Sequence, residues 1–170
     1  MELGKSKYTL GELQKILGYF VIEEDALQLQ PLTAGYINDT FLVSKSGNPL
    51  YVLQRINDKV FKDIQGLMSN AVMAIDSLSS KDYASIKLLR TRGGEYFTDG
   101  PEGYWRLMSF IHGSITFNNT TQEEVAFEAG RIIGKFHCLL QNEDMSNYVD
   151  TIPCFHNLCL RENEFEGALR

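Results

Sequence analysis

Residues 34–57 read AGYINDTFLVSKSGNPLYVLQRIN, and this stretch decides the fold. The pattern predicts two strands joined by a turn over residues 46–49, with a further turn at Gly35 before the first strand. Because side chains alternate along a strand, each strand presents one set of residues to each face of the sheet. The residues that share a face are Phe41 and Val43 on the first strand, and Tyr51, Leu53 and Arg55 on the second.

A glycine turn that leads into a hairpin with a strand-borne cation is a usable phosphate clamp. Backbone N–H groups near Gly35 can approach an anion closely, and the strand holds Arg55 at a fixed depth. The guanidinium fork also matches phosphate oxygens well. The same pattern is typical of an ordinary turn beside a surface arginine, so its weight depends on the rest of the chain.

Composition and charge exclude several classes of protein. A chain of 170 residues has room for one domain, or two small ones, and for a hydrophobic core. The formal net charge of −6 disfavours nucleic acid or an anionic membrane as the main partner. The polar N-terminus and the lack of a long apolar run predict neither a signal peptide nor a membrane span. Three cysteines without metal-ligand spacing are typical of a reducing compartment, so we expect a cytoplasmic protein with buried, unpaired cysteines.

Apolar residues at helical or alternating spacing predict the other elements, which together give an α+β fold. Capping boxes at Thr9 and at Thr121 open two of the helices. The later helix carries Gly130 and Gly134, whose small size permits close approach of a neighbouring element. The expected elements are helices over 9–20, 59–78 and from 121 onwards, a helix that opens at 161–170, and strands over 26–32, 85–90, 95–98 and 104–111.

Several motifs along the chain resemble those of one known family. They are GYINDTF at 35–41, YVLQRIN at 51–57, LMSN at 67–70, FIHG at 110–113, EAGR at 128–131 and TIPCFHN at 151–157. With these motifs the chain resembles the aminoglycoside phosphotransferase/choline kinase-like superfamily, and most closely its N-acetylhexosamine 1-kinase branch. The resemblance covers nearly the whole chain.

This resemblance implies a protein kinase-like small lobe, which is a twisted antiparallel sheet with one packed helix, followed by further helices. Residues 1–113 would form this nucleotide-binding lobe, and residues 114–170 the helical start of a large lobe. ATP is the implied nucleotide, with Mg²⁺ and a sugar in a complete enzyme. The implied nucleotide site consists of Gly35, Tyr36, Ile37, Asn38 and Thr40 in a loop that covers the phosphates, Arg55 as the strand cation, Leu53 on the same face toward the base, Met108 at the adenine pocket, and Ser109, Phe110 and Ile111 as a hinge whose backbone meets adenine.

The chain departs from the family's pattern where catalysis would lie. The family's His-Gly-Asp catalytic loop, its downstream Asn and its magnesium-binding Asp do not occur before Arg170. At 112–114 the sequence is HGS, without the aspartate, and we interpret it as part of the hinge. We therefore name no catalytic residue and no metal ligand, and interpret Asp39, Asp63 and Asp76 as solvated surface carboxylates.

A second departure concerns the support of the strand cation. Kinases place a glutamate in the middle of the small-lobe helix to brace this cation, and the helix over 59–78 has none there. Asn70 and Asp76 are the available substitutes on this helix.

Two functions from different classes remain open. In the first, the chain is the front portion of an ATP-dependent N-acetylhexosamine 1-kinase, which binds nucleotide without the catalytic lobe. In the second, it is a non-catalytic, kinase-like module that docks a partner through an exposed lobe interface. The wide apolar stripe of the helix over 123–140 predicts self-association through this helix or the adjoining tail.

Overall fold

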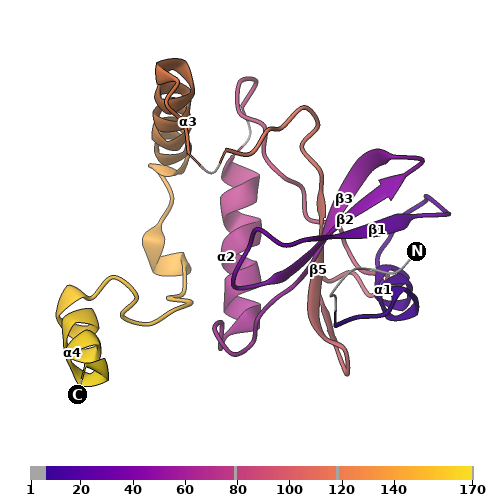
Figure 1. Cartoon of the computed structure of the whole chain (residues 1–170), viewed down its shortest axis with the longest axis horizontal. Helices are drawn as coiled ribbons and strands as arrows, with labels where there is room; N and C mark the ends of the chain where they lie inside the picture. Colours follow the sequence, from indigo (N-terminus) through magenta and orange to yellow (C-terminus); the bar gives the residue numbers. More distant parts are fainter. Residues whose placement is uncertain (1–6, 79, 118, 170) are drawn as a thin grey trace.

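The computed structural model describes residues 7–78, 80–117 and 119–169 of the chain. In these residues a five-stranded antiparallel sheet, in the order β1-β2-β3-β5-β4, is accompanied by four α-helices (Figure 1). The predicted α+β class is confirmed. The elements are α1 (Leu10–Leu17), β1 (Gln28–Leu32), β2 (Asp39–Lys45), β3 (Asn48–Arg55), α2 (Ile64–Ser77), β4 (Thr98–Gly100), β5 (Gly103–Ser109), α3 (Glu123–Leu140), a short 3-10 helix (Met145–Asn147) and α4 (Leu158–Ala168).

The predicted hairpin is present as β2 and β3. Its turn is tighter than predicted, at Ser46 and Gly47, whose φ angles are +52° and +83°. Positive φ at both central residues is typical of the two-residue turns that match the twist of paired strands. Across the hairpin Phe41 lies opposite Leu53, so the predicted face-sharing holds.

Helix α1 covers one face of the sheet. The predicted capping box is present at its N-terminus: Thr9 Oγ1 accepts from the Glu12 amide, and the Glu12 carboxylate accepts from the Thr9 amide at 2.7 Å. The apolar stripe of α1 packs against strand residues that are almost completely buried. This core consists of Leu13, Ile16, Leu17 and Phe20 from α1 and its end, and Leu29, Phe41, Val43, Leu53, Trp105 and Leu107 from the strands.

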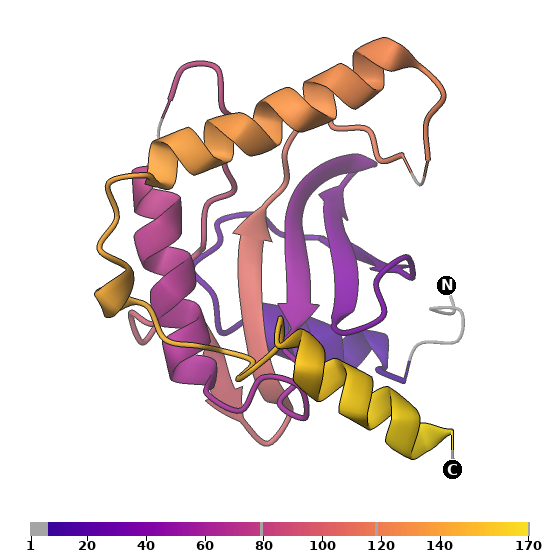
Figure 2. The same cartoon turned by 90° about the vertical axis from the view of Figure 1, so that its left-hand side faces the viewer.

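The other face of the sheet is only partly covered. Helix α2 packs through Ile64 and Met68 against Ile56 and Tyr104, on the β5 side. Figure 2 shows this face toward the viewer, with α2 along one side and α1 behind the sheet. Over β2 and β3 the side chains of this face remain half-buried, and Leu32 on β1 is 40% exposed.

Helix α2 begins at Ile64, later than the predicted start at residue 59. The carbonyl of Asn57 accepts from the amides of Val60 and Phe61, which forms a separate turn. Asp63 then caps the helix, since its Oδ1 accepts from the Gly66 amide at 2.7 Å. Asp63 is exposed, as expected, and in addition caps the helix.

Two of the predicted strands differ in the structure. Residues 85–90 form no strand; they run beside β5 through two backbone hydrogen bonds, from the amide of Leu89 to the carbonyl of Leu107 at 2.9 Å and from that of Ser109 to Lys87 at 2.8 Å. The strand expected at 95–98 is β4, which covers Thr98–Gly100 and pairs with β5.

The helices after residue 120 pack loosely on the rest of the chain. None of the residues of α3 and α4 that the structure describes is buried. The capping box expected at Thr121 is wrong. Thr120 Oγ1 accepts from the Gln122 amide at 3.1 Å, and α3 begins at Glu123 without a side-chain cap. Helix α4 starts at Leu158, earlier than expected, because Asn157 caps it.

The cysteine prediction is corrected in one respect. Cys138, Cys154 and Cys159 are unpaired, as expected, but all three are exposed instead of buried. They lie in α3, in α4 and in the segment between them, the part of the chain that adds little to the core. Across the described residues, no helix combines the length and the apolar character that crossing a membrane requires.

Candidate functional site

The glycine loop between β1 and β2 is tied to the end of β3. The Asn38 side chain accepts from the Asn57 amide at 2.9 Å, and the Asn57 side chain donates to the Ile37 carbonyl at 3.0 Å. Tyr36 at the loop tip is fully exposed. A Cβ added at Gly35 would meet no atom within 4 Å, so the loop leaves open space there.

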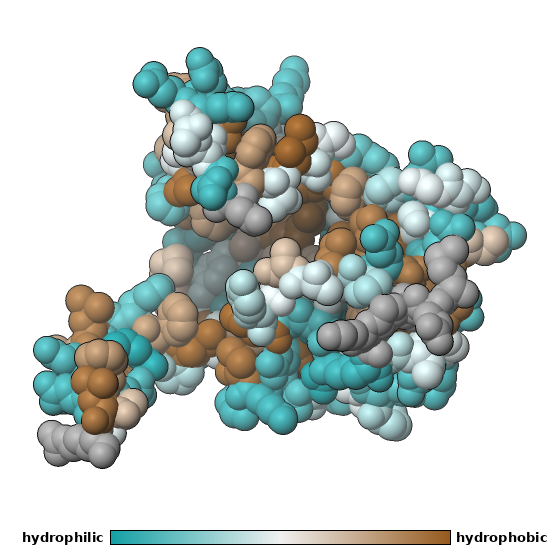
Figure 3. Space-filling model, in the orientation of Figure 1, coloured by the Kyte–Doolittle hydropathy of each residue, from teal (hydrophilic) through white to brown (hydrophobic). Residues whose placement is uncertain are grey.

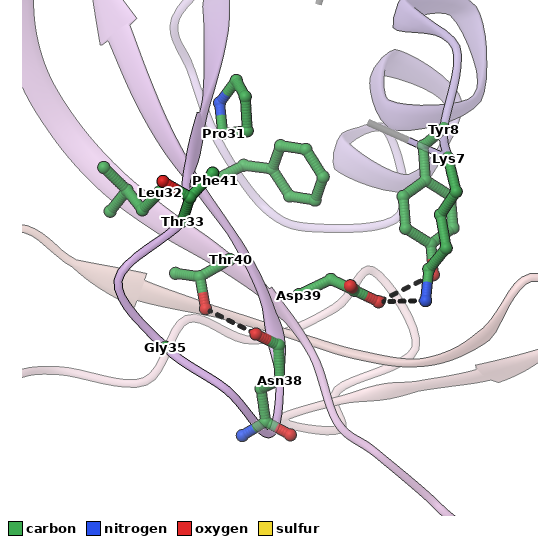
Figure 4. A pocket seen from close by; sticks show the side chains of 10 residues that line it. All are labelled: Lys7, Tyr8, Pro31, Leu32, Thr33, Gly35, Asn38, Asp39, Thr40 and Phe41. Carbon is green, nitrogen blue, oxygen red and sulfur yellow. Dashed lines mark hydrogen bonds and ion pairs between the residues drawn. The ribbon is translucent and has the colours of Figure 1, made fainter. Parts of the chain in front are cut away.

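Next to this loop lies a cavity of about 330 Å³, which Figure 4 shows from close by. Asp39 dominates its polar wall: the carboxylate accepts from the Tyr8 hydroxyl at 3.1 Å and pairs with Lys7 Nζ at 2.8 Å. The hydrogen bond to Asp39 is the main cause that raises the pKa of Lys7. Asp39 is therefore not simply solvated, and this cavity holds a balanced ion pair, which offers no spare cation to a phosphate.

Arg55 and Leu53 both lie on the face that α1 covers. The Leu53 side chain is completely buried in the core, so this structure does not expose it to a base. Arg55 pairs with Asp58, with 3.2 Å between Nη2 and Oδ1. Its guanidinium lies against the turn before β5, where a Cβ on Gly103 would come within 2.9 Å of Nε. The proposed phosphate cation is thus engaged at the end of the sheet.

Neither of the bracing residues named for Arg55 forms a hydrogen bond or ion pair with it within the described residues. Asn70 exchanges two hydrogen bonds with the backbone of Val149, at 2.8 and 3.0 Å, and so fastens the segment before α4 to α2. Asp76 is exposed. The acidic partner of Arg55 is Asp58, three residues along the chain.

The half-open face carries two neighbouring rows of side chains that run across the strands. The cross-strand register places an apolar row beside a polar one. The apolar row contains Leu42, Val52 and Met108, and the polar row contains Thr40, Gln54 and Arg106.

The polar row is joined by hydrogen bonds from the glycine loop to α2. Thr40 Oγ1 donates to the Asn38 carbonyl at 3.4 Å and accepts from Gln54 Nε2 at 3.0 Å. Gln54 Oε1 accepts from Arg106 Nε at 3.0 Å and from Nη2 at 2.7 Å. Arg106 Nη1 lies 3.9 Å from Met68 Sδ on α2. Burial lowers the pKa of the Arg106 guanidinium, and no carboxylate of a described residue pairs with it.

Sequence reasoning missed Gln54 and Arg106, although a signal for both was present. Gln54 stands next to Arg55, on the opposite face of the same strand. Arg106 stands two residues before Met108, so the alternation that places Met108 on this face also places Arg106 there.

The hinge residues are placed at the end of β5, beside this face. Met108 is buried and forms an isolated bridge with Leu88. The amides of Ser109 and Phe110 donate to the carbonyls of Lys87 and Leu50, so neither is free for adenine. Within the described part of the chain, the Ile111 amide has no hydrogen-bond partner. The predicted hinge thus offers a free donor at Ile111.

The donor set does not fit a bound Mg²⁺. Among the described residues, no three or more His, Cys, Asp or Glu side chains gather where they could hold a metal ion. The polar row consists of a hydroxyl, an amide and a guanidinium, without a carboxylate, whereas Mg²⁺ is usually bound through carboxylates and substrate phosphates. We therefore assign no step to a metal held by these residues.

The fold and this face define an α+β domain with a closed and a half-open side to its sheet. No family model matches the chain.

Proposed function

We propose that the chain is the nucleotide-binding small lobe of an ATP-dependent sugar kinase of the N-acetylhexosamine 1-kinase type, and that ATP binds on the half-open face of the sheet. The observation that carries the proposal is the pair of rows on that face. An apolar row suits a purine base, and a polar row beside it, with a cation at its end, suits phosphates. The motifs that resemble this kinase branch support the same function.

The neighbouring elements suit the two ends of a nucleotide. The free amide of Ile111 and the buried Met108 lie at the end of the apolar row, where a base needs a donor and an apolar wall. The loop around Gly35 lies at the other end of the same face, next to Thr40. Its backbone amides are the groups that a phosphate chain would approach.

The proposal concerns binding and assigns no phosphoryl transfer to these residues. Phosphoryl transfer needs a group that orients the nucleophile and metal-held phosphates, and the polar row supplies neither. The sugar and the residues that activate it stay outside the proposal.

A bulky substitution on the half-open face tests the proposal. We expect Val52→Trp to abolish ATP binding, measured by calorimetry, because the indole would fill the apolar row while pointing away from the core. The matched control is Val21→Trp, at a 56% exposed valine in the segment that follows α1, which should bind ATP as the parent does. Equal ATP binding by Val52→Trp and the parent would place the nucleotide elsewhere or nowhere on this chain.

A non-catalytic docking module is the second candidate, and α3 is the observation that favours it. Phe127 is 70% and Ile133 57% exposed on this helix. Figure 3 shows hydrophobic side chains at the surface of α4 as well, where Leu158 is 81% and Phe165 64% exposed. Exposed apolar surface of this kind usually meets another protein surface. A chain that binds no nucleotide but self-associates through α3 would favour this second function.

A further inference from the structure

We infer that Arg106 is the cation that receives the β- and γ-phosphates of the bound nucleotide, the role that the sequence suggests for Arg55. The inference rests on the proposed nucleotide site and names the residue that binds its anionic part.

The first step is the charge balance of Arg106. Buried arginines are normally paired with a carboxylate, because an uncompensated charge in a poorly solvated place is costly. Arg106 lies half-buried between β3 and α2, and the ion pairs among the described residues do not include it. The Gln54 carbonyl oxygen supplies a dipole in place of a charge. An anionic ligand would supply the missing charge.

The second step is the set of hydrogen-bond donors that Arg106 keeps available. A guanidinium carries five N–H donors. Nε and Nη2 share Gln54 Oε1, while Nη1 faces the thioether of Met68, which is a weak acceptor. The Nη edge of the guanidinium therefore has capacity for a phosphate oxygen, which is a much stronger acceptor.

The third step is the position of Arg106 relative to the other parts of the site. The hydrogen-bonded row from Asn38 through Thr40 and Gln54 connects the glycine loop directly to the guanidinium. Arg106 also shares its face with Met108 and Val52, where the base is proposed to bind. Arg55 lies on the opposite face of the sheet and is already paired with Asp58.

Calorimetric titration of the whole chain with ATP, adenosine and inorganic tripolyphosphate tests the inference. Arg106→Gln should weaken ATP and tripolyphosphate binding about ten-fold or more, since a charge-assisted contact is lost, and leave adenosine binding unchanged. Arg55→Gln is the matched control and should bind all three as the parent does. ATP binding that survives Arg106→Gln but falls in Arg55→Gln would overturn the inference and return the role to Arg55.

A second variant separates a binding role from a structural one. Arg106→Met replaces the guanidinium with an apolar chain, and we expect it to melt no lower than the parent because an uncompensated charge is removed. ATP should raise the melting temperature of the parent but not of this variant. A variant that melts well below the parent and is still stabilised by ATP would make Arg106 a structural residue and overturn the inference.

The three ligands also keep this inference distinct from the proposed function. If ATP binds no more tightly than tripolyphosphate, and both are weakened by Arg106→Gln, the nucleotide function is overturned while Arg106 remains an anion site. ATP binding indifferent to Arg106 would retain the function and overturn the inference. Binding of none of the three ligands by the parent would overturn both.

Discussion

Arg55 and Arg106 lie on neighbouring strands, yet on opposite faces of the sheet. The alternation of side chains along β3 predicted correctly which residues share a face with Arg55. It could not predict which face α1 would cover, because both faces carry apolar residues, such as Leu53 on one and Val52 on the other. The pairing of Arg106 with Gln54 was hidden as well, because strand register is a long-range property.

At the residue scale, Tyr51 provides a prediction about pH. Its hydroxyl donates to Glu24 Oε2 at 2.8 Å, and burial, followed by this hydrogen bond, raises the pKa of Tyr51 to about 12. Since the folded state favours the neutral phenol, the stabilisation is complete below the ordinary pKa near 10 and is lost as pH rises toward 12. We expect Tyr51→Phe to lower the free energy of unfolding by about 1 kcal/mol at pH 8, and this difference to shrink between pH 10 and 12.

Urea unfolding of both proteins across this pH range measures the difference directly. The control is Tyr83→Phe, because the Tyr83 hydroxyl makes no hydrogen bond with a described residue. A parent-to-variant difference that stays constant up to pH 12 would contradict the assigned role of the Tyr51 hydroxyl.

At the element scale, the sequence predicted the hairpin, α1 and β5 well, because each has a strong period and a local turn or cap. Helix starts were less predictable. A separate turn at Asn57 precedes α2, which then begins at the Asp63 cap, and α3 begins at Glu123 without a side-chain cap. The segment over 85–90 has strand-like residues but meets β5 through isolated hydrogen bonds, a tertiary outcome that the sequence does not reveal.

Two glycines in helices should respond oppositely to alanine. A Cβ on Gly66 in α2 would overlap the capping side chain of Asp63 and a methyl group of Val149, whereas a Cβ on Gly134 in α3 would meet nothing. We expect Gly66→Ala to destabilise the protein by roughly 1–3 kcal/mol through overpacking. Gly134→Ala should stabilise α3 by roughly 0.5–1 kcal/mol, since glycine is a poor helix former.

Thermal unfolding followed by circular dichroism compares the two glycine variants. Changes of the same sign would show that packing around Gly66 or the open space around Gly134 is not as described. The sequence also predicts that Gly130 and Gly134 permit close approach of a neighbouring element. Among the described residues no such element lies there, since a Cβ at either glycine would meet no atom within 4 Å.

At the scale of the whole molecule, the core and the surface are unevenly distributed. The sheet and α1 enclose the main core, while α3 and α4 bury none of their described residues. The segment after residue 120 is held to the rest through a few polar contacts, such as the ion pair of Lys135 with Asp82 and the hydrogen bonds of Asn70 with Val149. The sequence predicted an apolar stripe on α3, and the structure leaves much of that stripe exposed, with Ile133 57% exposed.

The exposed stripe on α3 leads to the prediction that two copies of this chain associate through it. Removing apolar surface from water is favourable, and the stripe on α3 keeps much of its apolar surface exposed. We expect Ile133→Glu to weaken self-association about ten-fold or more, measured by sedimentation velocity over a range of concentrations, because it places a charge in the contact. The control is Val21→Glu, at a position of nearly equal exposure, 56%, which should associate as the parent does. A parent that stays monomeric at the highest concentrations, or an Ile133→Glu variant that associates as strongly as the parent, would show that α3 is not the contact surface.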